Sequence, residues 1–287
     1  MILVADSGST TCNWGLLAAG RPTYFTTEGY NPYFVATPVI VASLRRQLPA
    51  TVQQAPIGAV HYYGAGVLSP AKAEVVAGAL RQLFPEAAIH VAEDLLGAAR
   101  ALLGHEPGFA TILGTGTNSC LFDGQQITQV VEGLGYSLGD EGCGTYIGRR
   151  LLRDYLRGRL PNGLGAAFQA TYQLGEVSEV LDRLYNQPLP NRFLASFAQF
   201  AHTHYHIPYC QAVVAEAFEA FFEQIVTHYP DYQRHTFNCV GSVGYYFQEA
   251  LAATAARHGM AAGQFLQAPI EALVRYHAAG KDFSRGL

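Results

Sequence analysis

Short apolar runs alternate with polar, glycine-containing turns at the start of the chain. Ile2–Ala5 and Cys12–Ala18 are apolar runs on either side of a polar turn, and Tyr24–Thr27 follows a turn at Gly20–Pro22. Runs of this length between turn residues are typical of strands. The sequence therefore predicts three consecutive antiparallel strands.

Alternating helices and strands are expected next. Ser69 precedes Pro70 at the start of a helical stretch, which is the usual order of an N-cap and a first helical residue. Asp94–Leu103 is rich in Ala and Leu, which favour helix. The expected elements are a helix near Pro38–Leu48, a strand near Ala59–Tyr63, a helix after Ser69, a strand at Ile89–Ala92 and a helix at Asp94–Leu103.

The pattern starts again after Pro107. Phe109–Leu113 is an apolar run, Gly114–Thr117 is a polar turn, and Ser119–Phe122 and Gln126–Val131 continue as strands. Because the second half repeats the element order of the first, the sequence predicts two related α/β domains with a boundary near Pro107. A mostly helical region follows from Gly144, with breaks at Pro161, Pro188–Pro190 and Pro208.

The composition excludes several classes of function. The 287 residues are 49% hydrophobic and 14% charged, which argues against disorder, and a net charge of −4 without a basic run disfavours nucleic acid and anionic membranes as partners. The N-terminal segment has the features of neither a signal peptide nor a membrane span. The five cysteines include no CxxC pair, which argues against a disulfide framework or a zinc ribbon and favours a cytoplasmic protein.

Two glycine-containing turns occupy equivalent places in the two halves. In the first, Asp6–Thr10, Gly8 allows a phosphate oxygen to approach the backbone, and the carboxylate of Asp6 is suited to hold Mg²⁺ through water. An ordinary hairpin in which Asp6 forms an Asx-turn fits the same residues. The second turn, Gly114–Thr117, is equally ambiguous alone. As a facing pair, the two turns are suited to clamp the phosphates of a nucleotide.

Two further glycine-rich segments are candidates for ligand contact. Gly241–Gly244 lies between an expected strand and a helical stretch at Tyr245–His258, which suits an adenosine site; the alternative is a strand-to-helix turn in which Ser242 caps the helix. Gly133–Gly144 holds five glycines around two adjacent carboxylates. Asp140 in this loop is suited to accept hydrogen bonds from a polyol, and the alternative is a mobile surface loop.

The order of these motifs resembles that of a known family. The motifs of the BadF/BadG/BcrA/BcrD-type ATPases occur here in the same order, as Asp6-x-Gly8-x-Thr10-x-x-x-Trp14, Asp94, Gly114-Thr-Gly-Thr-Asn118, the loop Gly133–Gly144 and Gly241-Ser242-Val243. Within that family the chain is most similar to the N-acetylglucosamine kinase-like proteins. The motifs cover nearly the whole chain, and their ordered set is more specific than any one of them.

The resemblance implies an α/β fold with two ribonuclease-H-like domains of the actin/hexokinase-type ATPase fold and a nucleotide cleft between them. Residues 1–106 would form the N-terminal domain, and residues 107–269 the C-terminal domain with a helical insertion. A final helix over about 270–287 would pack back on the first domain. The implied cofactors are ATP and Mg²⁺, and a homodimer is the implied assembly.

The same resemblance implies residue roles. An aspartate at the position of Asp94 takes the proton from the sugar hydroxyl while ATP and Mg²⁺ present the γ-phosphoryl group in line. From its neighbours alone, Asp94 suits the start of a helix equally well. The positions that match sugar-binding residues are Asn31, Asp94, Gly135 and Asp140. Those that match nucleotide-binding residues are Gly8, Ser9 and Thr10 in the first turn, Gly114, Thr115, Gly116 and Thr117 in the second, and Gly241 and Ser242 at the adenosine.

The implied function is an ATP-dependent kinase that phosphorylates a hydroxyl, expected at the 6-position, of an amino sugar such as N-acetylglucosamine or glucosamine. An ATPase activator of a radical enzyme is an alternative in the same family, although it needs a cluster-ligating cysteine pair that the cysteine spacing does not provide. A non-catalytic sugar or nucleotide sensor is a third reading. It is motivated by two departures, Thr11 in place of a cation and Leu134 in place of a tryptophan, while Asn13 stands where close relatives often have aspartate.

Two other clusters have structural explanations. The segment His202–Cys210 contains three histidines and a cysteine that suit zinc, but it follows a helical stretch, and histidines favour a helix C-terminus through the dipole. Three arginines recur at helical spacing and either meet phosphate or form a solvated helix face; they are Arg149, Arg153 and Arg157.

Overall fold

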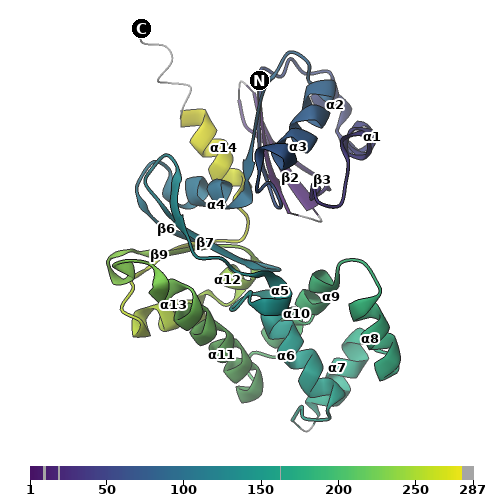
Figure 1. Ribbon diagram of the computed structural model, residues 1–287, viewed down its shortest axis with the longest axis vertical. Helices are drawn as coiled ribbons and strands as arrows, with labels where there is room; N and C mark the ends of the chain where they lie inside the picture. The colour runs from purple at the N-terminus through teal and green to yellow at the C-terminus, as the bar shows by residue number, and fades with distance from the viewer. Residues whose placement is uncertain (9–10, 19, 162, 280–287) are drawn as a thin grey trace. The chain divides into compact units, whose positions relative to one another are not determined.

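The computed structural model describes residues 1–8, 11–18, 20–161 and 163–279, which form two compact units (Figure 1). The N-terminal unit comprises Met1–Glu106, Gly124–Gln126 and the chain from Ala268 on, and the C-terminal unit comprises Pro107–Asp123 and Ile127–Gln267. Each unit has its own five-stranded sheet and its own apolar core.

The sheet of the N-terminal unit begins with the expected antiparallel meander and continues with two parallel strands. Its strand order is β3-β2-β1-β4-β5, and β1 pairs antiparallel with β2 and parallel with β4. In this register Asp6 lies opposite Asn13 on one side and Tyr63 on the other. The strands are β1 (Ile2–Ser7), β2 (Thr11–Leu17), β3 (Thr23–Glu28), β4 (Ala59–Gly64) and β5 (Ala88–Glu93).

Helices pack on both faces of this sheet. As expected, Ser69 caps α3 by accepting a hydrogen bond from the N–H of Lys72. The helix α14 contacts α4, β1 and β2 (Figure 1), and the absence of a side chain at Gly15 leaves room for Val274 of α14. The helices are α1 (Thr37–Gln47), α2 (Ala50–Gln53), α3 (Pro70–Leu83), α4 (Asp94–Leu103) and α14 (Ile270–Ala279). Residues 280–287 of the expected final helix lie outside the described residues.

The sheet of the C-terminal unit repeats this plan. Its order is β10-β9-β6-β7-β8, in which β6, β7 and β8 form the meander and β9 and β10 are the added parallel strands. Read from the other edge, this order matches that of the N-terminal unit, so the predicted duplication of element order is confirmed. The strands are β6 (Gly108–Leu113), β7 (Thr117–Phe122), β8 (Ile127–Val130), β9 (Phe237–Val240) and β10 (Ala262–Leu266).

The helical region of the C-terminal unit is divided where the prolines predict. Pro190 and Pro208 are the first residues of α9 and α11, where the missing N–H of proline costs no hydrogen bond. The helices are α5 (Gly135–Leu138), α6 (Gly144–Leu156), α7 (Leu164–Tyr172), α8 (Val177–Tyr185), α9 (Pro190–Ser196), α10 (Ala198–Thr203), α11 (Pro208–Gln224), α12 (Ser242–Tyr246) and α13 (Gln248–Arg257), with 3-10 turns at Val226–His228 and Tyr232–Arg234.

The helix expected at Tyr245–His258 differs from the structure. Helix formation begins earlier, at Ser242, and is interrupted at Phe247, so that two helices replace one. Gly241, with φ at 122°, occupies the N-cap position, and Ser242 is the first helical residue and makes no capping hydrogen bond. The capping alternative for Ser242 is therefore wrong. None of the helices in the described ranges is long and apolar enough to cross a bilayer.

Candidate functional site

Asp6 lies near the end of β1, at the carboxyl edge of the parallel strands. Its Oδ2 accepts a hydrogen bond of 3.4 Å from Nδ2 of Asn13. Burial raises the pKa of Asp6 to about 7; the bond from Asn13 lowers this pKa and the charge of Asp94 raises it further. The N–H of Gly8 bonds the carbonyl of Thr11 at 3.0 Å. In an Asx-turn the N–H of Gly8 would instead donate to the carboxylate of Asp6. The Asx-turn alternative is therefore wrong.

Asp94 is the first residue of α4 and follows β5 directly. Since β1, β4 and β5 are parallel, their carboxyl ends meet at one edge, and this brings Asp94 into the electrostatic range of Asp6. Burial raises the pKa of Asp94, and backbone hydrogen bonds from Leu95 and from Asp94 itself partly offset that rise. The N-cap position is occupied by Glu93, so Asp94 is not the cap residue.

A close helix–strand contact fixes the position of α4. A β-carbon at Gly97 would lie 2.8 Å from Cβ of Tyr63 on β4, a separation that folded proteins do not tolerate. Glycine at this position therefore lets the first turn of α4 lie directly against the strand, with Asp94 at its start.

Asn31 lies in a loop of the N-terminal unit, where two contacts hold its side chain. Its Oδ1 accepts a hydrogen bond of 3.0 Å from the N–H of Tyr33, and its side chain packs against Gly66, where a β-carbon would overlap it. The N–H of Tyr30 bonds Oγ of the buried Ser7, which ties this loop to the end of β1. Of the predicted residues, Ser9 and Thr10 lie outside the described residues.

In the C-terminal unit, Asp140 lies over the turn between β6 and β7. The residue is only 8% exposed. Its Oδ1 accepts a hydrogen bond of 3.1 Å from the N–H of Thr117, and its own N–H donates to the carbonyl of Gly133 at 2.7 Å. Burial raises the pKa of Asp140, and the bond from Thr117 opposes that rise. The structure thus brings together two sites that were predicted separately, the sugar loop and the second phosphate turn.

Most glycines of the loop Gly133–Gly144 are needed for packing within the protein. A β-carbon at Gly133 would overlap the carbonyl of Thr117, one at Gly139 would overlap the carbonyl of Gly133, and one at Gly142 would lie 2.8 Å from Cβ of Phe221. Gly135 differs, because it has φ of 72° and nothing within 4 Å of its missing β-carbon. At Gly133, Gly139 and Gly142, close packing within the protein, and not contact with a ligand, explains the glycine.

The turn between β6 and β7 presents N–H groups rather than carbonyls. The carbonyl of Gly114 accepts from the N–H of Gly144 at 2.8 Å, and that of Thr115 accepts from Thr145 at 3.1 Å. These bonds also satisfy the first N–H groups of α6. Over the described ranges, the N–H groups of Thr115 and Gly116 have no hydrogen-bond partner, so they are available to an anion.

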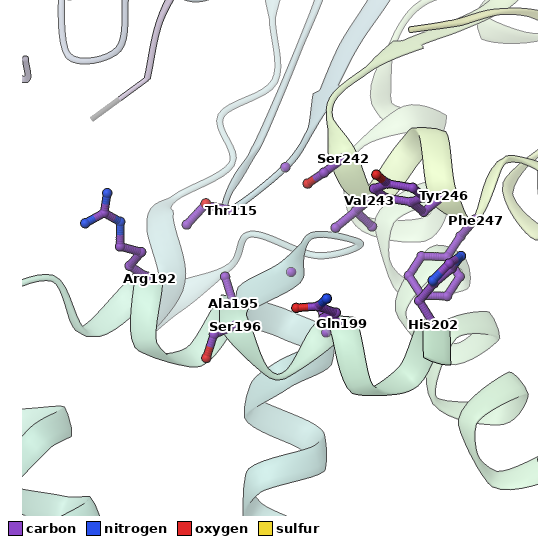
Figure 2. Close-up of a pocket in the computed structure, with 13 residues that line it drawn as sticks. Thr115, Arg192, Ala195, Ser196, Gln199, His202, Ser242, Val243, Tyr246 and Phe247 are labelled. Carbon is purple, nitrogen blue, oxygen red and sulfur yellow. The ribbon is translucent and has the colours of Figure 1, made fainter. Parts of the chain in front are cut away.

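A cavity of about 590 Å³ opens beside this turn (Figure 2). Three predicted residues line it, namely Gly114, Thr115 and Ser242, whereas Gly241 instead packs on the carbonyl of Leu113 at the end of β6. Three further lining residues, Gly144, His202 and Val243, lie in segments that the sequence singled out without giving these residues a ligand role in a nucleotide site. The remaining lining residues, which no local motif marks because their position depends on how the helices pack, are Arg192, Ala195, Ser196, Ala198, Gln199, Tyr246 and Phe247.

The structure also describes the surroundings of the histidine cluster and the arginine cluster found in the sequence. His202 lines the cavity, and His204 stacks on Phe200 with ring centroids 4.0 Å apart. No group of three or more His, Cys, Asp or Glu side chains in the described ranges is arranged to hold a metal ion. Arg149 donates to the carbonyl of Tyr136 at 2.9 Å, in the short helix α5.

Comparison with known proteins places the chain in a family. No protein-family model matches the sequence, and no curated protein matches it. A solved structure of a candidate N-acetylglucosamine kinase from Porphyromonas gingivalis is 40% identical and covers 98% of this chain and 100% of its own, with a TM-score of 0.92. A second candidate N-acetylglucosamine kinase, from Chromobacterium violaceum, is 19% identical over 96% of this chain and 98% of its own, with a TM-score of 0.68.

The fold extends to more distant kinases. A ROK family glucokinase from Streptomyces griseus, solved with glucose and AMPPNP, is 16% identical, covers 98% of this chain and 99% of its own, and has a TM-score of 0.54. None of these structures carries the BadF/BadG/BcrA/BcrD name, so that part of the sequence-based assignment stays a prediction. At 40% identity over 98% of its length to the Porphyromonas gingivalis protein, the chain belongs to the N-acetylglucosamine kinase-like family, with the α/β actin/hexokinase-type ATPase fold.

Proposed function

We propose that the chain is an ATP-dependent kinase that transfers the γ-phosphoryl group to the 6-hydroxyl of an amino sugar, N-acetylglucosamine or glucosamine. The family supports a sugar kinase as the general activity. The observation that carries the chemical proposal is the position of two partly buried carboxylates, Asp6 and Asp94, at one edge of the parallel strands of the N-terminal unit.

Asp94 is the proposed general base. Burial raises its pKa, and a carboxylate that holds a proton more tightly is a better acceptor for the proton of the attacking hydroxyl. Asn31 would bind the sugar in the same unit, and Gly135 and Asp140 would do so in the C-terminal unit. Asp140 already uses Oδ1 to hold Thr117, so its Oδ2 is the oxygen that remains for a sugar hydroxyl.

Asp6 is the proposed anchor for Mg²⁺, through water. The fit is chemical: Mg²⁺ prefers oxygen ligands and retains most of its waters, and Oδ1 of Asp6 makes no hydrogen bond within the described ranges. Mg²⁺ held there would neutralise charge on the phosphates and would lower the pKa of Asp6, which burial raises. Asn13 keeps the carboxylate of Asp6 in place by donating to the other oxygen.

The nucleotide would bind through the first turn, at Gly8, Ser9 and Thr10, and through the C-terminal unit. In that unit, Gly116 and Thr117 belong to the same turn as Gly114 and Thr115, and Ser242 lines the cavity beside it. Gly241 would shape this site through its packing on β6 rather than by contact.

A panel of sugars tests the proposal. Release of ADP from ATP and Mg²⁺ should be stimulated by N-acetylglucosamine or glucosamine and should not be stimulated by their 6-deoxy analogues, which lack the acceptor oxygen. The ratio of kcat/KM for the two amino sugars reports whether Leu134 retains an acetamido preference. ATP binding without stimulation by any sugar would contradict the kinase and favour the nucleotide sensor.

A further inference from the structure

A guanidinium without a partner lines the cavity of the C-terminal unit. Arg192, in the first turn of α9, is the only Lys or Arg among the residues that line this cavity. In the part of the chain that the structure describes, its side chain makes no ion pair and no hydrogen bond. Other arginines of this unit are neutralised, as Arg150 is by Asp154 and Glu216.

The backbone of α9 is fixed against the same helix that holds the β6–β7 turn. Gly148 of α6 lies against the carbonyl of Leu194, where any β-carbon would overlap, and the missing β-carbon of Gly144 would lie 3.2 Å from Cβ of Ala195. Because Gly144 also donates its N–H to Gly114, α6 holds both α9 and the turn. The backbone of Arg192 in α9 therefore has a defined position relative to the N–H groups of Thr115 and Gly116.

The cavity has one polar, cationic end and one aromatic end. Figure 2 shows Arg192 and Thr115 toward one end and His202, Tyr246 and Phe247 toward the other. The rings of His202 and Tyr246 have centroids 5.0 Å apart and planes inclined at 53°, and the ring of Phe247 stands edge-on to His202, so polarisable ring faces and edges line that end. Aromatic surfaces of this kind stack on nucleobases, whereas unpartnered N–H groups and a guanidinium bind phosphate.

We propose that Arg192 binds the polyphosphate of the nucleotide, with the base at the aromatic end of the same cavity. This inference rests on the proposed function and names a phosphate-binding residue that no sequence motif indicates. The chain carries a net charge of −4, so a polyanion gains no attraction from the protein as a whole and needs a local cation. The fork of the guanidinium suits bidentate contact with phosphate oxygens.

The test compares ATP with adenosine on three variants, by isothermal titration calorimetry. Arg192→Gln removes the charge and keeps most of the stem, Arg192→Lys keeps the charge, and Arg183→Gln removes a cation that stacks over Phe193 and does not line this cavity. Arg192→Gln should weaken ATP binding by about 10- to 100-fold, the range of a lost charge-assisted hydrogen bond, and leave adenosine binding unchanged. Arg192→Lys should recover part of the loss, and Arg183→Gln should bind both ligands like the wild type.

The outcomes separate this inference from the proposed function. Equal weakening of ATP and adenosine, or no change in either, would overturn the role of Arg192 even if the wild type phosphorylates a sugar. Selective loss of ATP binding in Arg192→Gln would support that role even if no sugar stimulates ADP release. Failure of the wild type to bind ATP would overturn both. Thermal melting of Arg192→Gln should match the wild type, because the side chain has no partner to lose.

Discussion

At the scale of single residues, Asp94 and Asp6 lie at one edge of the sheet, but different hydrogen bonds hold their carboxylates. Both are partly buried, and the loss of solvent around each carboxylate raises its pKa. Asp6 also receives a hydrogen bond from Asn13, whereas Asp94 receives its hydrogen bonds from the backbone of α4. A carboxylate at a helix start keeps its orientation without a side-chain partner, which leaves its outer oxygen for a substrate hydroxyl.

Replacing Asp94 with Asn is expected to abolish proton acceptance and keep the shape of the site. Turnover should fall by about 10²–10⁴, the usual contribution of a general base, while ATP affinity stays the same. The measurements are ADP release at saturating sugar and ATP binding by calorimetry. Glu93→Gln is the matched control, since it removes the neighbouring carboxylate at the N-cap and should retain turnover. Turnover near the wild-type value in Asp94→Asn would remove Asp94 from the mechanism.

Gly66 is expected to control the position of Asn31. Its φ of 78° and the overlap of any β-carbon with the Asn31 side chain mean that Gly66→Ala displaces Asn31. We expect KM for the sugar to rise by about 10-fold, the effect of losing one or two hydrogen bonds, with ATP affinity unchanged. Gly104→Ala is the control, because Gly104 has φ of 63° and nothing within 4 Å, so it carries the backbone cost alone. An equal KM increase in both variants would show that strain, not Asn31, is responsible.

At the scale of elements, local signals in the sequence predicted the helices and strands that they govern. The Ser69–Pro70 cap and the Ala- and Leu-rich run at Asp94–Leu103 define α3 and α4, because capping and propensity act within a few residues. β10 was not predicted: most of Ala262–Leu266 is exposed and lacks a hydrophobic alternation, so its pairing with β9 is a tertiary property. The break at Phe247 has no sequence signal that we identified.

The residues of the candidate site also differ in whether a local pattern in the sequence predicts them. Asp6, Gly114 and Asp140 belong to short motifs. The sequence predicts them because the residues that form a turn are close together in the chain. Arg192 lines the cavity because α9 packs on α6 at Gly148, a contact that no pattern in the sequence predicts. Residues contributed by the helical insertion therefore required the structure.

Three stacked histidine rings join α14 to the N-terminal sheet. His61 of β4 lies between His277 of α14, at a centroid distance of 3.8 Å, and His90 of β5, at 4.7 Å. The hydroxyl of Tyr63 accepts a hydrogen bond of 2.8 Å from Arg100 and lies 2.9 Å from Nε2 of His277. Because Arg100 can only donate, the Tyr63 hydroxyl keeps its own proton for a second partner, and a neutral His277 without a proton on Nε2 can accept it.

This histidine stack predicts a loss of stability in acid. Burial, then the neighbouring ring and Arg100, lower the pKa of His61 to about 4 and that of His277 to about 3. The unfolded chain titrates near 6.5, so it binds more protons than the folded chain below that pH, and stability present above pH 6.5 is lost as the pH falls toward 4. We expect a decrease of roughly 2–4 kcal/mol in the free energy of unfolding between pH 7 and pH 4 from this pair.

Urea unfolding at a series of pH values measures this effect. His277→Phe retains a ring on His61 and cannot titrate, so it should flatten the dependence between pH 6.5 and pH 4. Arg100 still donates to the Tyr63 oxygen, and the loss of the His277 contact should lower stability by a similar amount at every pH. His235→Phe is a suitable control, because it removes a histidine of the C-terminal unit that has no ring partner in the described ranges. An unchanged pH dependence in His277→Phe would assign the acid sensitivity to other groups.

At the scale of the whole molecule, two units with the same strand order carry different parts of the proposed chemistry. The N-terminal unit holds the carboxylates of Asp6 and Asp94 and the side chain of Asn31, and the C-terminal unit holds the cavity beside the β6–β7 turn. Each unit has its own core, so a ligand that contacts one unit stabilises that unit directly. In the proposed assignment, the general base belongs to the N-terminal unit and the site of the nucleobase to the C-terminal unit, while the phosphates and the sugar would each contact residues of both units.

Hydrogen exchange with separate ligands tests this division. Adenosine should slow exchange in peptides that cover residues 198–203 and 240–247 and leave residues 29–35 unaffected, because it contacts the C-terminal unit alone. N-acetylglucosamine should slow exchange at residues 29–35 and 94–98. At 100 times the dissociation constant, the protection of amides that exchange through unit-wide opening should approach about 100-fold. AMPPNP should combine the adenosine pattern with protection of the strand ends beside Gly8, because we propose that its phosphates bind the first turn. Equal protection of both units by adenosine would contradict the assignment of the base to the cavity beside Arg192.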